Sequence, residues 1–108
     1  MSATVLTDDD FDAFISSTNK PVLVDVWATW CAPCRALSPV IDELALEFAG
    51  ELQVVKVDAD ANPQIVAELG VSSIPSIFLI KDSRVVGKMT GVHTKQQIAQ
   101  ELLEEAAQ

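Results

Sequence analysis

Residues 21–27 read P-V-L-V-D-V-W and constrain the fold of this chain more than any other stretch. Both alternating faces of this run are apolar, which is typical of a strand that is covered on both sides. A helical pattern follows from about Pro33 to Phe48, and a second buried strand is predicted at Gln53–Val57. A strand, a helix and a strand in this order predict a right-handed parallel crossover. The sequence therefore predicts an α/β domain with helices on both faces of a mixed sheet.

The other elements are predicted from caps, periodicity and turns. Three further helices are expected to begin at residues that commonly cap helices, namely Thr7, Asn62 and Thr94. Three further strands are expected, one at the sheet edge and two as an antiparallel hairpin: Thr4–Leu6, Ser76–Ile80 and Arg84–Met89. Pro39 should kink the helix that contains it, because its ring excludes a backbone carbonyl one turn earlier. The chain of 108 residues is thus predicted to be a single domain, residues 1–108, with five strands and four helices.

The charge of the chain excludes several classes of partner. Its formal net charge is −9, and its 7 Lys and Arg residues form no cluster. Such a protein is repelled by nucleic acid and by anionic membrane surfaces. The N-terminal segment lacks the pattern of a signal peptide, and no apolar run reaches the roughly 20 residues of a membrane span. We therefore expect a cytoplasmic protein, in which a C-x-x-C pair indicates redox chemistry.

Both cysteines of the chain lie in the segment W-C-A-P-C-R, at Cys31 and Cys34. Residues three apart in a helical turn bring their Cβ atoms to about 5–6 Å, so a small adjustment makes or breaks a disulfide. As a structural staple the pair would be weak, because closing so short a loop gives only roughly 2 kcal/mol. A zinc site is disfavoured because two Cys and the distant His93 fall short of four ligands. The spacing favours a pair that cycles between dithiol and disulfide.

The position of the two sulfur atoms in the helix distinguishes their roles. If Pro33 is the first helical residue, Cys31 lies near the N-cap and can accept hydrogen bonds from the backbone N–H groups of Cys34 and Arg35. These donors, the helix dipole and the nearby Arg35 favour a thiolate at Cys31. Cys34 lies further into the helix and should be more buried. Cys31 is therefore predicted to be the nucleophile and Cys34 the resolving thiol.

At this point the chain resembles the thioredoxin family. The segment W-C-A-P-C-R, preceded by V-D-V-W-A-T, is similar to the active-site segment of that family. The similarity extends through Pro39, K-V-D-A-D-A-N-P and G-V-S-S-I-P-S to Gly91. It implies a thioredoxin fold, protein disulfide reduction without a bound cofactor, and reducing equivalents from a thioredoxin reductase. One departure is Ala32, where the family commonly has Gly beside both sulfur atoms.

Two charged residues are candidates for proton transfer. Asp25 lies in the most apolar strand, so loss of hydration should raise its pKa. It is predicted to accept a proton from Cys34, a role that the resemblance also implies; the alternative is an aspartate at a sheet edge that reaches water. Lys56, in the neighbouring strand, is the expected partner charge of Asp25. Its alternative is an ordinary outward-facing lysine.

The resemblance also implies a substrate-binding groove around the cysteines. Ile74-Pro75 is expected to be a cis peptide, with Ile74 offering backbone hydrogen bonds to an extended peptide. Gly91 suits a position where the backbone approaches a ligand closely. The complete set of expected groove residues is Trp30, Ala32, Pro33, Ile74, Pro75, Gly91 and Val92. Trp27 is expected in the core, and His93 in a loop.

The sequence thus predicts a monomeric, general protein disulfide reductase that acts on disulfide-containing proteins. An oxidant or isomerase is disfavoured because isomerase-like members usually carry His where this chain has Pro33. The alternative from another class is a non-catalytic, peptide-binding module of the same fold. Intact Cys31, Cys34 and Asp25 argue against that alternative.

Overall fold

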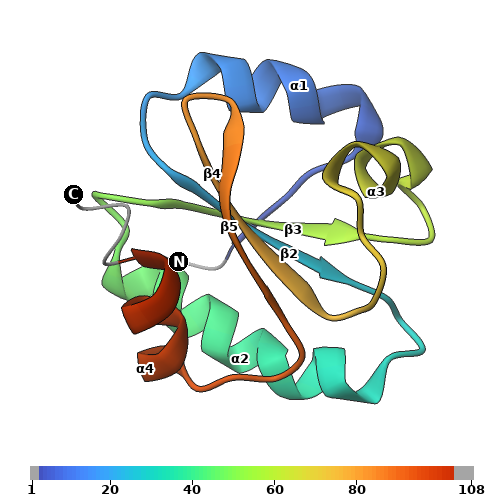
Figure 1. Ribbon diagram of the computed structural model, residues 1–108, viewed down its shortest axis with the longest axis vertical. Coiled ribbons are helices and arrows are strands. Elements are labelled where there is room, and N and C mark those ends of the chain that lie inside the picture. The colour runs from blue at the N-terminus through green and yellow to red at the C-terminus, as the bar shows by residue number, and fades with distance from the viewer. Residues whose placement is uncertain (1–2, 104–108) are drawn as a thin grey trace.

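The computed structural model describes residues 3–103 and shows one mixed sheet with helices on both faces (Figure 1). The strands lie in the spatial order β1-β3-β2-β4-β5. Their bounds are β1 Thr4–Val5, β2 Val22–Trp27, β3 Gln53–Asp58, β4 Ser76–Lys81 and β5 Arg84–Thr90. The α-helices are α1 Asp8–Ser17, α2 Ala32–Glu47, α3 Pro63–Leu69 and α4 Lys95–Ile98. The predicted fold class, a five-stranded mixed sheet flanked by four helices, is confirmed.

The helices form two layers, with α1 and α3 above the sheet in Figure 1 and α2 and α4 below it. Each layer buries its apolar residues against one face of the sheet. The buried helix residues of the upper layer are Phe11, Ile15 and Ile65. Those of the lower layer are Leu37, Ile41, Leu44, Ala45 and Ile98. The sheet is therefore covered on both faces, as the apolar strands predict.

β2 is the central strand, and all of it except the half-buried Trp27 is buried. It pairs in parallel with β3 and antiparallel with β4, so the predicted parallel crossover through α2 is confirmed. Its three valines join the core beneath α1 and α3. Because side chains alternate between the faces of a strand, Asp25 and Trp27 lie on the opposite face, toward α2.

The long helix α2 begins one residue earlier than the sequence predicts. Its first residue is Ala32 rather than Pro33, and Cys31 is the N-cap with an extended backbone. Pro33 still lies in the first turn, where the N–H that proline lacks would have had no partner within the helix. Pro39 lies inside the helix as expected. The helix continues past Pro39 to Glu47.

The capping predictions hold at one helix and fail in detail at another. Thr94 and Gln97 form the predicted capping box of α4, with both hydrogen bonds present. Thr7 occupies the N-cap position of α1, but its side chain does not cap the helix. Its hydroxyl instead donates to Asp10 Oδ2 at 3.2 Å. The side chain is exposed, and the carboxylate one turn later competes for it.

The start of α3 is capped by a residue distant in the sequence. Asn62 is the N-cap residue, but its side chain makes no capping bond to α3. Its Oδ1 accepts a hydrogen bond from the Asp8 backbone N–H at 2.8 Å. The Asp8 carboxylate in turn accepts from the N–H groups of Gln64 and Ile65, at 3.2 and 2.9 Å. The two helices α1 and α3 therefore satisfy each other's N-terminal groups.

The last helix changes its winding along its length. α4 continues into a short π-helix at Ala99–Leu103. Ile98 and Leu102 are buried, and Leu103 packs against the same core, as their spacing predicts. No helix within residues 3–103 combines the length and the apolar character that crossing a membrane requires.

The hairpin between β4 and β5 turns through two residues in left-handed conformations. Asp82 and Ser83 have φ angles of 52° and 63°, and Lys81 pairs with Arg84 across the turn. Positive φ at both central residues is the pattern of a type I′ turn, which favours Asn-Gly. Asp tolerates this conformation better than Ser, so the strain lies mainly at Ser83.

We expect Ser83→Gly to stabilise the fold by about 0.5–1 kcal/mol. Relief of left-handed strain, worth roughly 1–2 kcal/mol, exceeds the entropic cost of glycine, roughly 0.5–1 kcal/mol. Urea denaturation at constant pH measures the change in the free energy of unfolding. Ser83→Ala is the matched control, because alanine keeps the strain. An equal gain from both substitutions would contradict the explanation.

Candidate active site

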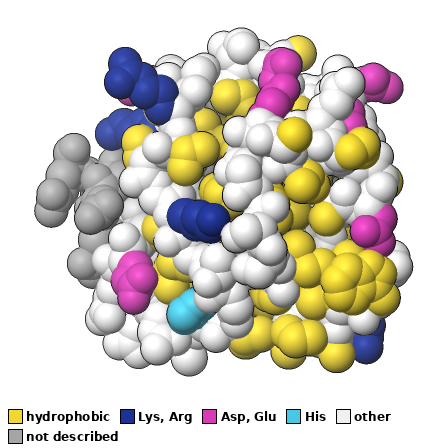
Figure 2. All heavy atoms as spheres, turned by 45° about the vertical axis from the view of Figure 1, so that its right-hand side comes forward, with side chains coloured by type: hydrophobic (Ala, Val, Ile, Leu, Met, Phe, Trp, Pro, Cys, Tyr) yellow, Lys and Arg dark blue, Asp and Glu magenta, His cyan; other side chains and the backbone are white. Residues whose placement is uncertain are grey.

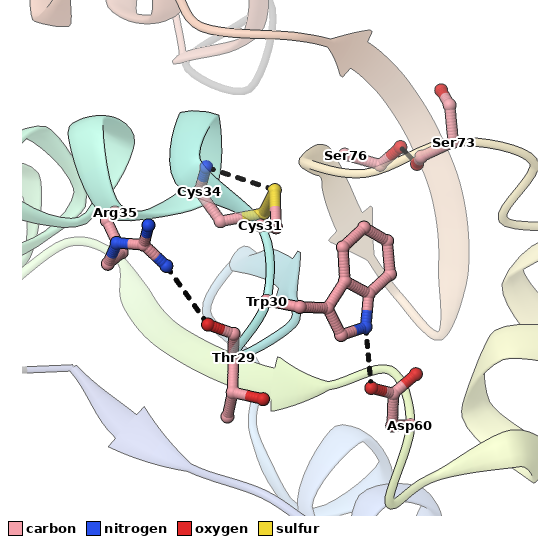
Figure 3. Close-up of a disulfide and its surroundings, with 8 residues drawn as sticks. All are labelled: Thr29, Trp30, Cys31, Cys34, Arg35, Asp60, Ser73 and Ser76. Atoms are coloured by element: carbon pink, nitrogen blue, oxygen red, sulfur yellow. Dashed lines mark hydrogen bonds between the residues drawn. A yellow bond between two sulfur atoms is a disulfide. The ribbon is translucent and has the colours of Figure 1, made fainter.

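The two cysteines lie at the start of α2 and are joined by a disulfide (Figure 3). Their Cα atoms are 5.2 Å apart. Cys31 is the N-cap residue, and its Sγ accepts a hydrogen bond from the Cys34 backbone N–H at 3.2 Å. A helix N-terminus favours negative charge, and its first N–H groups need acceptors. This position supports the expected thiolate at Cys31 in the reduced protein.

Two details of the expected cysteine environment differ from the prediction. The Arg35 backbone N–H donates to the Cys31 carbonyl oxygen at 3.3 Å and not to the sulfur. The Arg35 guanidinium donates to the Thr29 carbonyl oxygen at 3.0 Å (Figure 3). Cys34 is not clearly more buried than Cys31, since the exposed fractions are 3% and 4%. Depth of burial therefore does not separate the two sulfur atoms in the disulfide form, and position in the helix does.

Asp25 is buried in the centre of the sheet, with an exposed fraction of 2%. Its Oδ1 atom has no hydrogen-bond partner among the described residues. Desolvation raises the pKa of Asp25 from 3.8 to about 7, against the lowering effect of the Lys56 charge and with a smaller raising effect of Asp42. The alternative of an aspartate at the sheet edge is wrong, because β2 has a strand on each side.

A cavity of about 280 Å³ connects Asp25 with the second cysteine. Its lining residues are Asp25, Trp27, Cys34, Arg35, Ser38 and Lys56. The Trp27 indole N–H is also buried without a hydrogen-bond partner among the described residues. Trp27 is half-buried and packs against the cluster that contains both cysteines, so its expected place in the core is found only in part. A carboxyl group and a thiol that face one cavity can exchange a proton directly or through water.

Lys56 does not form the expected ion pair with Asp25. The two residues are opposite each other in the register of β2 and β3. The Lys56 ammonium instead donates to Ser38 Oγ at 2.8 Å and lies 3.0 Å from Asp42 Oδ1. The contact with Asp42 is one of charge only, because that oxygen is not aligned for a hydrogen bond. Lys56 is also not an ordinary outward-facing lysine, since 17% of its side chain is exposed.

The peptide bond between Ile74 and Pro75 is cis, as the resemblance implies. Pro75 is buried, and Ile74 packs against the cluster that contains both cysteines. The Pro75 carbonyl oxygen accepts a hydrogen bond from the Gly91 backbone N–H at 2.9 Å. Gly91 has a φ of 84°, which accounts for glycine at this position. The structure therefore joins the cis-proline loop to the Gly91 loop.

Trp30 lies on the surface beside the disulfide, with 67% of its area exposed. Its indole N–H donates to Asp60 Oδ2 at 2.8 Å, which fixes the ring (Figure 3). Trp30 and Ile74 line a groove of about 360 Å³, together with Ala59, Val66, Val71, Ser72 and Ser73. This groove reaches from Trp30, the residue before Cys31, to Val66 of α3.

The other predicted groove residues are also accessible. Ala32 and Pro33 are exposed in the first turn of α2, and Val92 is 48% exposed. Figure 2 shows hydrophobic side chains gathered at the lower right of the face in view, where few charged side chains interrupt them. A contiguous exposed apolar surface is a feature of binding sites.

Sequence reasoning missed three residues that position the site. Asp60 holds the Trp30 ring, while Ser38 and Asp42 hold the Lys56 ammonium. Ser38 and Asp42 are four residues apart, a spacing that places them on one face of α2. That spacing is a signal that the two side chains share a face of α2, but it does not indicate that Lys56 contacts them. Asp60 carried no comparable signal.

Residues 3–103 contain no group of three or more His, Cys, Asp or Glu side chains that is placed to hold a metal ion. Of the described side chains around the disulfide, the reactive groups are two sulfur atoms and one buried carboxyl. His93 lies in the loop after Gly91, where its Nε2 is 2.7 Å from the Thr90 carbonyl oxygen. The two cysteines and the Asp25 carboxyl can carry out two-electron exchange between a dithiol and a disulfide.

Comparison with known proteins gives one consistent result. The family model described as Thioredoxin matches residues 2–104. A thioredoxin of Haemophilus influenzae is 44% identical over 94 residues, which are 87% of this chain and 88% of that protein. A thioredoxin of Mycobacterium bovis is 45% identical over 102 residues, 94% of this chain and 88% of that protein. One of Staphylococcus epidermidis is 42% identical over 94% of this chain and 96% of its own length.

The raised pKa of Asp25 predicts a pH dependence of stability. Between pH 4 and 7 the unfolded chain releases this proton while the folded chain keeps it, so stability falls as pH rises. The loss amounts to at most about 4 kcal/mol, at 1.36 kcal/mol for each pKa unit. Asp25→Asn should remove this loss, so its stability advantage should grow up to pH 7 and then level off.

Urea denaturation of both oxidised proteins at a series of pH values measures this difference. Asp9→Asn, at an exposed aspartate of α1, controls for the loss of one negative charge. A constant difference between Asp25→Asn and the unsubstituted protein across pH 4–8 would show that folding does not shift the titration of Asp25.

Proposed function

The chain belongs to the thioredoxin family and is a protein-disulfide reductase, and we propose that Cys31 attacks substrate disulfides while Cys34 resolves the product. The observation that carries this assignment is the place of Cys31 at the N-cap of α2, with the Cys34 N–H 3.2 Å from its sulfur. An N–H donor and a helix N-terminus stabilise a thiolate there, and the thiolate is the nucleophile in disulfide exchange.

The proposed reaction has two exchange steps. The Cys31 thiolate attacks one sulfur of a target disulfide, forms a mixed disulfide and releases the other target sulfur as a thiolate. Cys34 then loses its proton and attacks Cys31 Sγ, which expels the second target sulfur and forms the Cys31–Cys34 disulfide. The target gains two electrons, and the enzyme loses two.

Asp25 is proposed to take the proton from Cys34 in the second step. Both residues line the same cavity, and the pKa of Asp25 near 7 matches the pH at which a general base works well. Lys56 is proposed to influence this step through its charge, because it lines the cavity without forming an ion pair with Asp25.

The substrate is proposed to be an extended segment of a protein that contains a disulfide. Ile74, which precedes the cis proline, would offer backbone hydrogen bonds, and the Gly91 loop would lie beside it. Trp30, Ala32, Pro33 and Val92 would supply apolar contact around the cysteines. The groove between Trp30 and Ile74 supports a peptide rather than a small, fully enclosed ligand.

The family and the charge of the chain support the wider setting that we propose. A thioredoxin reductase would return the disulfide to the dithiol, without a cofactor bound to this chain. The net charge of −9 disfavours nucleic acid and anionic membranes as partners. We further propose that residues 1–108 act as one domain and as a cytoplasmic monomer.

Reduction of insulin by dithiothreitol separates the reductase from a peptide-binding module, because only a reductase accelerates insulin precipitation. Cys31→Ser should abolish the acceleration, since no nucleophile remains.

Cys34→Ser should form a mixed disulfide with the target and retain it, because no resolving thiol remains. Mass spectrometry after incubation with a disulfide peptide should find a stable adduct on Cys34→Ser only. An adduct on Cys31→Ser alone would reverse the assignment.

Asp25→Ala should slow the release of the target more than the formation of the mixed disulfide, because the carboxyl serves only Cys34. Removing one proton acceptor typically costs 10²–10⁴-fold in a step that depends on it. Stopped-flow fluorescence with a labelled disulfide peptide measures the two steps separately. Equal slowing of both steps would rule out a specific role in resolution.

A further inference from the structure

The register of the sheet places Lys56 beside Asp25, but the Lys56 ammonium does not contact Asp25. In the register of β2 and β3, Lys56 is directly opposite Asp25, and both side chains lie on the face toward α2. A lysine side chain is long enough to reach a carboxylate on the neighbouring strand. The ammonium instead contacts α2, where it donates to Ser38 Oγ at 2.8 Å and lies 3.0 Å from Asp42 Oδ1.

The other charged groups around the cavity do not replace Lys56. From α2, Arg35 lines the cavity, but its guanidinium is bonded to the Thr29 carbonyl oxygen. From β3, Asp58 lies on the same face, and its Oδ1 accepts the Asp60 backbone N–H at 3.0 Å. On the other side of Asp25, β4 contributes the uncharged Ile77.

The cysteine that faces Asp25 carries no charge in the disulfide form. Cys34 is the cavity residue from the first turn of α2, and in this form its sulfur does not titrate. Among the described residues that line the cavity, Lys56 is therefore the cation that is held by side chains. Substitution of Ser38 and Asp42 would remove those contacts and change its position relative to Asp25.

We propose that Ser38 and Asp42 are positioning residues that hold the Lys56 ammonium against α2 and so prevent it from pairing directly with Asp25. The two residues are four apart on one face of the helix, and both contact the ammonium, Ser38 by a hydrogen bond and Asp42 by its charge. Asp25 Oδ1, which has no hydrogen-bond partner among the described residues, is left without a direct contact to this counter-charge, which acts on it only from a distance. The proposal rests on the proposed role of Asp25 in resolution.

The consequence concerns the strength of Asp25 as a base. An ammonium in contact with a carboxylate stabilises its charged form and lowers its pKa. A carboxylate with a lower pKa is a weaker base toward the Cys34 thiol at neutral pH. By holding Lys56 at a distance, Ser38 and Asp42 would keep Asp25 able to accept a proton near pH 7.

The test is a titration of Asp25 by carbon-13 NMR in the oxidised protein, where the cysteines do not titrate. In the double variant Ser38→Ala/Asp42→Asn, the freed ammonium should approach Asp25. The midpoint of the Asp25 titration should fall by about 1 pH unit or more, the usual effect of an adjacent opposite charge. An unchanged or higher midpoint would overturn the proposal.

A second comparison separates the position of Lys56 from the direct effect of the Asp42 charge. Loss of that charge alone also favours ionised Asp25, because Asp42 raises the pKa of Asp25. The same double substitution is therefore repeated in a Lys56→Met background. If the two residues act through Lys56, the fall should be less than half as large there. An equal fall in both backgrounds would show that Ser38 and Asp42 do not act through Lys56.

Glu47→Gln is the matched control for charge on the same helix. Glu47 pairs with Lys95 at 3.4 Å on the exposed side of α2. Its substitution should leave the midpoint of the Asp25 titration unchanged. A fall as large as that of the double variant would attribute the effect to helix charge in general and overturn the proposal.

The titration needs no turnover, so it remains informative even if the protein fails to reduce disulfides. When it does reduce them, the pH profile of target release should show its midpoint shifted to lower pH in the double variant. A shift in the NMR titration without one in the release profile would leave the positioning established and would contradict the role of Asp25 as the base.

Discussion

The arrangement of the site depends on the pairing of β2 with strands on both sides. This pairing covers both edges of β2 and satisfies its backbone groups, while the two helix layers cover the side chains on its two faces. The loop after β2 then leads directly into α2, whose first residues carry the disulfide. The Asp25 carboxyl group in this strand lines one cavity with Cys34 and is nevertheless only 2% exposed. The disulfide at the start of α2 and the raised pKa of Asp25 both result from this placement of β2.

Much of this could be predicted from the sequence because the signals are local. The apolar run that includes Asp25 predicts a central strand, and the cysteine spacing predicts a helix start with two exchangeable sulfur atoms. The capping box at Thr94 was predictable for the same reason, since both of its partners lie within one helical turn. The cis peptide before Pro75 had no such local signal and was expected only from resemblance.

The parts that could not be predicted are choices between partners that are close in space but distant in sequence. Lys56 has a carboxylate available on the neighbouring strand and another on α2, and the sequence does not indicate which one it contacts. The same applies to Trp30, whose ring is fixed by Asp60, thirty residues later. In each case the outcome depends on side-chain directions that only the assembled layers determine. Propensity and periodicity indicate which face of a helix or strand a residue occupies. These contacts depend on the distances between side chains of different elements.

The exchange of hydrogen bonds between Asp8 and Asn62 links the N-terminal segment to the rim of the active site. Asp8 caps α3, and Asn62 also donates to the Asp58 carbonyl oxygen at 2.9 Å, so both residues brace the turn that carries Asp60. Asp60 in turn fixes Trp30 beside the disulfide. Cleavage or truncation just before Phe11 would therefore remove the support of this turn as well as the start of α1. The proposed substrate-binding surface around Trp30 would lose order although its own sequence was intact.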